Sequence, residues 1–149
     1  MTIKIILADS YQIVRQGLAL LLDSEPDMHV VGEAGDCSTT FRLIQAFSPH
    51  VVIMDICLPD SNGVETTRRI VSEFPHIKVI ALSMHSDSLF VLNMLNAGAS
   101  GYLLKDCAVE ELVKAIRTVL TQKIYLSSNL SNMLVKDLAS RISSDNCCR

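Results

Sequence analysis

The sequence lacks three features that would narrow its class immediately. No apolar run approaches the ~18 residues that a membrane-spanning helix needs. The five cysteines form no CxxC pair and their number is odd, so neither a metal cluster nor a disulfide framework is indicated. The net charge of −3 shows no basic excess of the kind that nucleic-acid-binding domains carry. We therefore expect reduced thiols, no membrane segment and no DNA contact by these residues.

The composition that is present favours a folded domain. Hydrophobic residues make up 49% of the chain and charged residues 19%, which excludes global disorder. A length of 149 residues suits one domain with a short appendage. The first nine residues are too short and too soon acidic for a secretory signal, so we expect a cytoplasmic protein.

Short apolar runs alternate with helical patterns along most of the chain. The expected strands are residues 3–8, 29–33, 51–54, 78–82 and 101–104. Expected helices cover about residues 12–23 and 86–96, and three more are marked by apolar residues within 41–47, 64–74 and 112–120. One helix between consecutive strands predicts an α/β fold, a parallel five-stranded sheet covered on both faces. We expect the flavodoxin-like strand order 2-1-3-4-5.

Residues 123–149 differ from the alternating pattern. Ser127 and Ser128 can cap a helix that carries a single apolar stripe, whereas residues 143–149 have no structural signal. We therefore expect one domain over residues 1–122, followed over 123–149 by a linker with an amphipathic helix and a disordered end.

Four polar side chains follow four of the predicted strands. The first and third strands lead into Asp9 and Asp55, the fourth into Ser83 and the fifth into Lys105. Ligands bind at the carboxyl ends of parallel strands, where the strand order reverses, so the two carboxylates should meet there. Any one of these residues alone is more often a helix cap or a solvated side chain. Together, these four groups are suited to binding Mg²⁺ and to forming an aspartyl phosphate.

Three other uses of such a sheet fit the sequence poorly. A phosphatase of the haloacid dehalogenase type needs a second Asp two residues after its nucleophile, where this chain has Cys57. A dinucleotide binder needs a glycine-rich loop after the first strand, and residues 9–12 contain no glycine. A flavin binder needs a Ser/Thr-rich phosphate loop at the same place, and that loop is missing too.

The chain resembles the receiver domains of two-component response regulators, in the LuxR/FixJ/NarL-type branch that also carries a helix-turn-helix. The resemblance covers residues 2–122 in order and spacing. It rests on residues 6–9, 52–59 with Gly63, 81–83 and 98–106.

This resemblance implies roles for the site residues. Asp55 would accept a phosphoryl group from a sensor histidine kinase, and Lys105 would pair with that group. Mg²⁺ would be held by Asp9, by Asp55 and by the backbone carbonyl of Cys57. The protein would then be a phosphoacceptor in a phosphorelay that regulates transcription. It would not be an enzyme beyond self-phosphorylation and self-dephosphorylation.

The resemblance also implies a switch. Ser83 would move toward the phosphoryl group, and Tyr102 would change rotamer in response. That change would alter the face made by the fourth helix, the fifth strand and the fifth helix. Cys57 and His85 each lie two residues beyond a site residue, where they would tune the lifetime of the phosphate.

One residue departs from the family pattern. The family has two adjacent acids after the first strand, and here the second is Ser10. A serine hydroxyl is a weaker ligand than a carboxylate for a hard cation, so we expect weak Mg²⁺ binding and slow phosphorylation. The alternative is a pseudo-receiver, an interaction or dimerisation module that works without phosphate.

The partners that the resemblance implies are a sensor histidine kinase, a second copy in a homodimer, and DNA through a domain absent from these residues. Residues 123–149 resemble the linker that leads to the helix-turn-helix of this branch. We therefore expect the chain to be a truncated form of a longer regulator.

Overall fold

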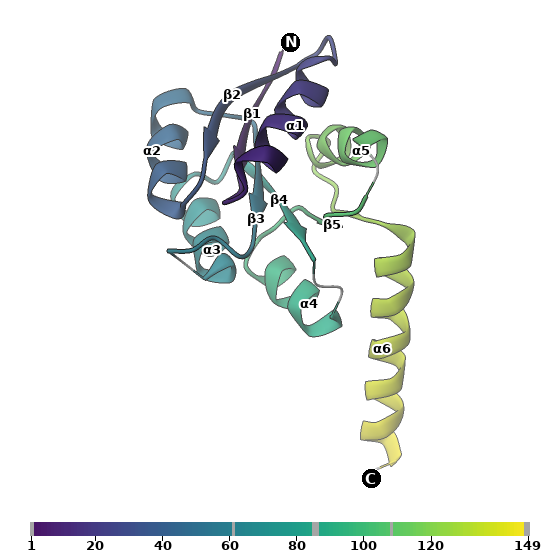
Figure 1. Cartoon of the computed structure of the whole chain (residues 1–149). Coiled ribbons are helices and arrows are strands. Elements are labelled where there is room, and N and C mark those ends of the chain that lie inside the picture. The colour runs from purple at the N-terminus through teal and green to yellow at the C-terminus, as the bar shows by residue number, and fades with distance from the viewer. Residues whose placement is uncertain (1, 61, 85–86, 108, 148–149) are drawn as a thin grey trace.

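The computed structural model describes residues 2–60, 62–84, 87–107 and 109–147. Strands and helices alternate through these residues, and Figure 1 shows the strands at the centre with helices on both sides. The elements are β1 (Ile3–Ala8), α1 (Gln12–Asp23), β2 (Met28–Ala34), α2 (Cys37–Phe47), β3 (Val51–Asp55), α3 (Gly63–Glu73), β4 (Lys78–Ser83), α4 (Ser88–Asn96), β5 (Gly101–Leu104), α5 (Val109–Val119), β6 (Tyr125–Leu126) and α6 (Ser128–Cys147).

The strands form one parallel sheet in the order β2-β1-β3-β4-β5-β6. The α/β fold class and the order of the five predicted strands are confirmed. The sixth strand was not predicted, because Tyr125 and Leu126 are too short a run to show a strand period. β6 pairs with β5, with Gly101 opposite Tyr125 and Tyr102 opposite Leu126.

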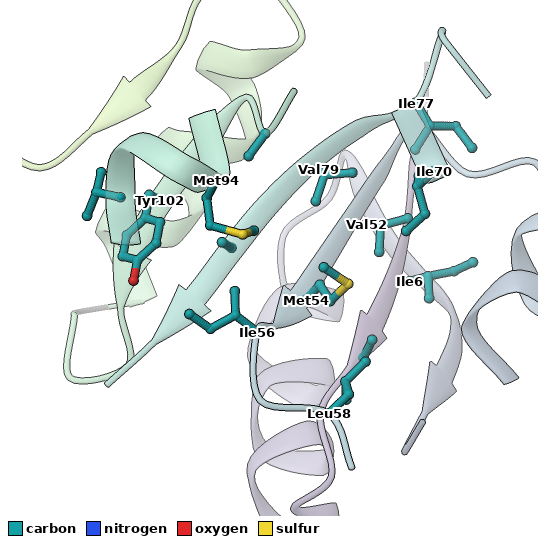
Figure 2. Close-up of a cluster of buried hydrophobic side chains, with 14 of the residues drawn as sticks. Ile6, Val52, Met54, Ile56, Leu58, Ile70, Ile77, Val79, Met94 and Tyr102 are labelled. Carbon is teal, nitrogen blue, oxygen red and sulfur yellow. The ribbon is translucent and has the colours of Figure 1, made fainter. Parts of the chain in front are cut away.

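The sheet separates two apolar cores. Alternate residues of a strand point to opposite faces, so Ile5 and Leu7 pack on one side of β1 and Ile6 and Ala8 on the other. The first core lies against α1 and α5, and the second against α2, α3, α4 and α6. Figure 2 shows side chains of the second core that come from strands, helices and loops, with Tyr102 at one end of it.

The local sequence explains where several helices begin and end. The side chain of Asp36 accepts a hydrogen bond from the Thr39 amide at 2.7 Å and so caps the start of α2. Asn62 caps α3 in the same way, accepting from the Val64 amide at 2.9 Å. After α4 the chain turns at Gly98, whose φ of 107° favours glycine.

The segment after residue 122 is integrated into the fold. Leu130 and Leu134 of α6 are 1% and 7% exposed and belong to the same core as Tyr102. The predicted linker therefore packs on the sheet edge and on α4. α6 continues to Cys147, through residues where we predicted disorder, and its C-terminal part extends away from the sheet (Figure 1).

No helix in the described part of the chain is long and apolar enough to cross a membrane.

One histidine links two strands. The Lys4 amide donates to Nδ1 of His50 at 2.9 Å, and the His50 amide donates back to the Lys4 carbonyl at 2.9 Å. Burial lowers the pKa of His50, and the nearby charges of Lys4 and His76 lower it further. The folded protein therefore favours neutral His50, whose Nδ1 can accept the hydrogen bond.

We expect this histidine to make stability depend on pH. Between the lowered pKa and the unfolded value of ~6.5 the unfolded chain binds more protons. Stability is then fully present above pH ~6.5 and declines as the pH falls through that range. Because His50 is only partly buried, the slope should stay well below the limit of about 1.4 kcal/mol per pH unit.

The check is urea unfolding of the natural chain and of His50→Asn between pH 7.5 and 5.5. Asparagine keeps an acceptor near the position of Nδ1 but does not titrate. The difference in unfolding free energy should move in favour of the variant as the pH falls. A difference that does not change with pH would show that His50 has no such role.

Candidate functional site

The register of the sheet brings the two predicted carboxylates together. Ala8 on β1 lies opposite Met54 on β3, so Asp9 and Asp55 both follow at the carboxyl edge. Each is only 4% exposed. Two carboxyl groups so deeply buried require partners, because burying a lone charge is strongly unfavourable.

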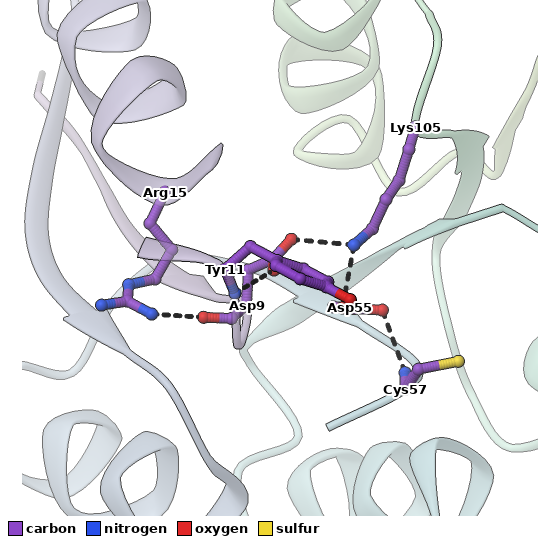
Figure 3. A network of polar contacts seen from close by, with 6 residues as sticks. All are labelled: Asp9, Tyr11, Arg15, Asp55, Cys57 and Lys105. Atoms are coloured by element: carbon purple, nitrogen blue, oxygen red, sulfur yellow. Dashed lines mark hydrogen bonds and ion pairs between the residues drawn. The ribbon is translucent and has the colours of Figure 1, made fainter. Parts of the chain in front are cut away.

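Lys105 is the partner of both. It follows β5, and its Nζ lies 3.0 Å from Oδ2 of Asp9 and 2.9 Å from Oδ2 of Asp55 (Figure 3). Its main-chain amide donates to the Ser83 carbonyl at 2.8 Å, which fixes the loop at the end of β4. Burial by itself lowers the pKa of Lys105, but the hydrogen bonds and charges of Asp55 and Asp9 outweigh it and raise the pKa above its ordinary value.

The other oxygen of each carboxylate is held by its own loop. The Tyr11 amide donates to Oδ1 of Asp9 at 2.8 Å, and the Cys57 amide donates to Oδ1 of Asp55 at 3.0 Å. Each acid therefore has one oxygen fixed by backbone and one directed at Lys105, as Figure 3 shows.

Two residues at this site were not predicted to have a role. The ring of Tyr11 lies 5.6 Å from Nζ of Lys105, in cation–π range. Arg15 of α1 donates from Nη1 to the main-chain carbonyl of Asp9 at 2.5 Å, and its Nε lies 3.5 Å from Glu33. A sequence signal for Arg15 exists only in retrospect: it is a basic residue in the otherwise uncharged first turns of α1.

Ser83 and Tyr102, the predicted switch pair, are both buried in the interior. A hydrogen bond joins their side chains. Burial raises the pKa of the Tyr102 phenol, although the hydrogen bond with Ser83 acts in the opposite direction. The phenol therefore stays protonated, and Tyr102 lies beside the end of β4.

The remaining predicted residues lie at the rim. Ser10 follows Asp9 directly and is exposed, and the Cys57 side chain is exposed as well. Gly63 fits closely under the loop after β3, since a Cβ there would come within 2.6 Å of the Ile56 carbonyl oxygen. His85 lies outside the described residues.

The face of α4, β5 and α5, predicted to carry the signal, is partly covered by this chain itself. β6 pairs along the outer edge of β5, and α6 packs against α4. A change at Tyr102 would therefore reach α6 through shared core contacts, including Leu130.

The family assignment follows from sequence and structure together. The family model described as response regulator receiver domain matches residues 5–117, and the chain belongs to that family. Its relatives place it in the LuxR/NarL-type branch, as the residues predicted.

Particular proteins show how far the similarity extends. The transcriptional regulatory protein DegU of Brevibacillus brevis is 34% identical over 96% of this chain and 61% of its own length. A two-component response regulator of the LuxR family from Aurantimonas sp. SI85-9A1 is 34% identical, with a TM-score of 0.88 over 93% of this chain and 99% of that one. A structure of two RcsB dimers bound to DNA is 26% identical, with a TM-score of 0.83 over 90% and 68%. The chain thus spans about three-fifths of the length of DegU.

Proposed function

We propose that this receiver domain accepts a phosphoryl group on Asp55 and passes the resulting change to a transcriptional output. The observation that carries the proposal is the position of Lys105, within 3.0 Å of two buried carboxylates from separate strands. A purely structural ion pair needs one acid for one base. Two acids at one ammonium form an anionic site, which is suited to a cation and a phosphate.

The reaction follows from the same contacts. A carboxylate oxygen of Asp55 attacks the phosphorus, and the bond from phosphorus to the donor breaks. With a phosphohistidine donor the imidazole leaves and takes up a proton; with acetyl phosphate the leaving group is acetate. Lys105 then turns from the carboxylates to the phosphoryl oxygens, and the Ser83 hydroxyl donates to one of them.

The donor set fits Mg²⁺. Asp9, Asp55 and the Cys57 carbonyl are hard oxygen ligands, and Ser10 adds only a neutral hydroxyl. When bound, the ion supplies charge neutralisation for the incoming phosphoryl group. No group of three or more His, Cys, Asp or Glu side chains in the described residues is placed to hold a metal. We therefore propose that Mg²⁺ binds weakly and that water molecules complete its coordination.

The proposed partners are a sensor histidine kinase and a second copy of this chain. α1, beside the site, carries the exposed apolar side chains Ile13 and Leu20 and follows the exposed N-cap residue Tyr11, and together they offer contact area. RcsB, which is similar in structure, forms dimers on DNA. For this chain we propose DNA control only through residues outside it.

The second candidate, a phosphate-independent pseudo-receiver, has Ser10 as its support. It does not explain why Lys105 is held by both acids, nor why each acid keeps one oxygen free of backbone bonds. We therefore favour the phosphoacceptor.

Intact mass after incubation with acetyl phosphate tests the proposal, with and without Mg²⁺ and beside Asp55→Asn. We expect a Mg²⁺-dependent gain of one phosphoryl group in the natural chain and none in the variant. No gain at any Mg²⁺ concentration, in a protein whose fold is verified by circular dichroism, would favour the pseudo-receiver.

A further inference from the structure

Asp60 connects the loop after Asp55 to the start of a different helix. Its carboxylate accepts from the Cys37 amide at 2.7 Å and from the Ser38 amide at 3.3 Å. Both amides belong to the first turn of α2, and Asp60 lies 23 residues away from Cys37 in sequence. Because Cys37 is buried, its amide has little access to water as a substitute partner.

The helix does not need Asp60 for its own cap. Asp36 already takes the Thr39 amide at 2.7 Å, as an N-cap residue does. Asp60 takes the two amides that precede it, so two carboxylates divide the free donors of one helix end. The contribution particular to Asp60 is therefore the tie between α2 and the loop.

That loop carries a proposed metal ligand. Cys57 lies between Asp55 and Asp60, and its amide is bonded to Asp55 at 3.0 Å. Gly63 supports the loop from below, against Ile56. With Asp60 bonded to α2, the loop is held on both sides of Cys57.

We propose that Asp60 is a positioning residue, which fixes the loop so that the Cys57 carbonyl is in place before Mg²⁺ binds. The inference rests on the proposed function. Loss of the tie leaves the chemistry of Asp55 and Lys105 intact but makes the ion order the loop as it binds. The Mg²⁺ concentration for half-maximal phosphorylation should rise, whereas the rate at saturating Mg²⁺ should stay near that of the natural chain.

Three variants separate positioning from capping. Asp60→Ala removes the tie, and Asp60→Asn keeps one acceptor oxygen. Asp36→Ala is the matched control, because it weakens the same end of α2 without touching the loop. Unfolding free energies of all three would be measured first, so that effects are compared at similar loss of stability.

Two readouts are then taken. The first is hydrogen exchange of the Cys57 amide, without Mg²⁺ or phosphodonor. The second is the half-saturating Mg²⁺ concentration for phosphorylation by acetyl phosphate. For Asp60→Ala we expect about tenfold faster exchange and a rise of about threefold to tenfold in the Mg²⁺ requirement, since charge-assisted bonds to backbone amides are lost. Asp60→Asn should recover part of both, and Asp36→Ala should change neither.

Equal effects of Asp60→Ala and Asp36→Ala on both readouts would overturn the proposal and reduce Asp60 to a helix cap. Unchanged Cys57 exchange in Asp60→Ala would also overturn it. If the natural chain takes no phosphate, the proposed function fails, while the exchange measurement still decides whether Asp60 fixes the loop.

Discussion

Replacing Lys105 with methionine is expected to abolish most phosphorylation by acetyl phosphate and to destabilise the protein. Asp9 and Asp55 are each 4% exposed, and Lys105 is their only ion-pair partner among the described residues. Removing one partner of a buried ion pair costs about 3–5 kcal/mol, because the other charge stays buried. The Lys105 side chain is 15% exposed, so we expect the lower end of that range.

The effect of losing the Lys105 ion pairs can be separated from general damage to the fold. The stability deficit should be specific to this site, because Lys105 is the ion-pair partner of two buried carboxylates. Added Mg²⁺ should restore part of the deficit, since it replaces the missing charge. Lys114→Met, on the exposed side of α5, is the control. It should show neither the stability deficit nor its recovery with Mg²⁺.

Urea unfolding with and without Mg²⁺, together with intact mass after acetyl phosphate, measures both effects. A Lys105→Met protein that unfolds like the natural chain and accepts phosphate at the natural rate would show that the ammonium has no role at this site.

Replacing Ser10 with aspartate is expected to lower the half-saturating Mg²⁺ concentration for phosphorylation by about tenfold or more, equivalent to about 1.4 kcal/mol of binding. Ser10 follows Asp9 at the carboxyl edge of β1 and is exposed, so a longer acidic side chain can reach the ion without disturbing the core. The substitution adds a charged oxygen ligand where there is now a neutral hydroxyl.

The same substitution should lower stability without Mg²⁺, because a third negative charge then lies beside Asp9 and Asp55. Ser10→Asn introduces a side chain of the same size as Ser10→Asp but without its charge. It should change neither the half-saturating Mg²⁺ concentration nor the stability much. The measurements are phosphorylation rates over a Mg²⁺ series and thermal unfolding with and without the ion. If the natural chain at low Mg²⁺ is phosphorylated as fast as Ser10→Asp, the idea of a handicapped site is wrong.

The sequence allowed the centre of the site to be predicted because parallel strands end at one edge. Knowing that Ala8 and Met54 lie opposite each other near the carboxyl ends of neighbouring strands is enough to place Asp9 beside Asp55. The carboxyl ends of β4 and β5 likewise deliver Ser83 and Lys105. These positions depend on the strand order, and the alternation of strands and helices restricts that order to a few choices.

The contacts around the centre could not be predicted, because they depend on where loops and helices pack. Arg15 reaches the Asp9 carbonyl and Asp60 reaches α2, and neither contact has a sequence period. β6 is two residues long, and it forms because the chain after α5 passes along the edge of β5. The burial of Leu130 follows from that path and not from the helical stripe alone.

The most direct test of the central claim is chemical mapping of the phosphorylated residue. The protein would be incubated with acetyl phosphate and Mg²⁺, treated with borodeuteride to reduce the acyl phosphate to homoserine, and digested for peptide mass spectrometry. The proposed function predicts one labelled position, Asp55, and no label without Mg²⁺. Label at Asp9 or elsewhere, or no label in a protein that is folded, would contradict it.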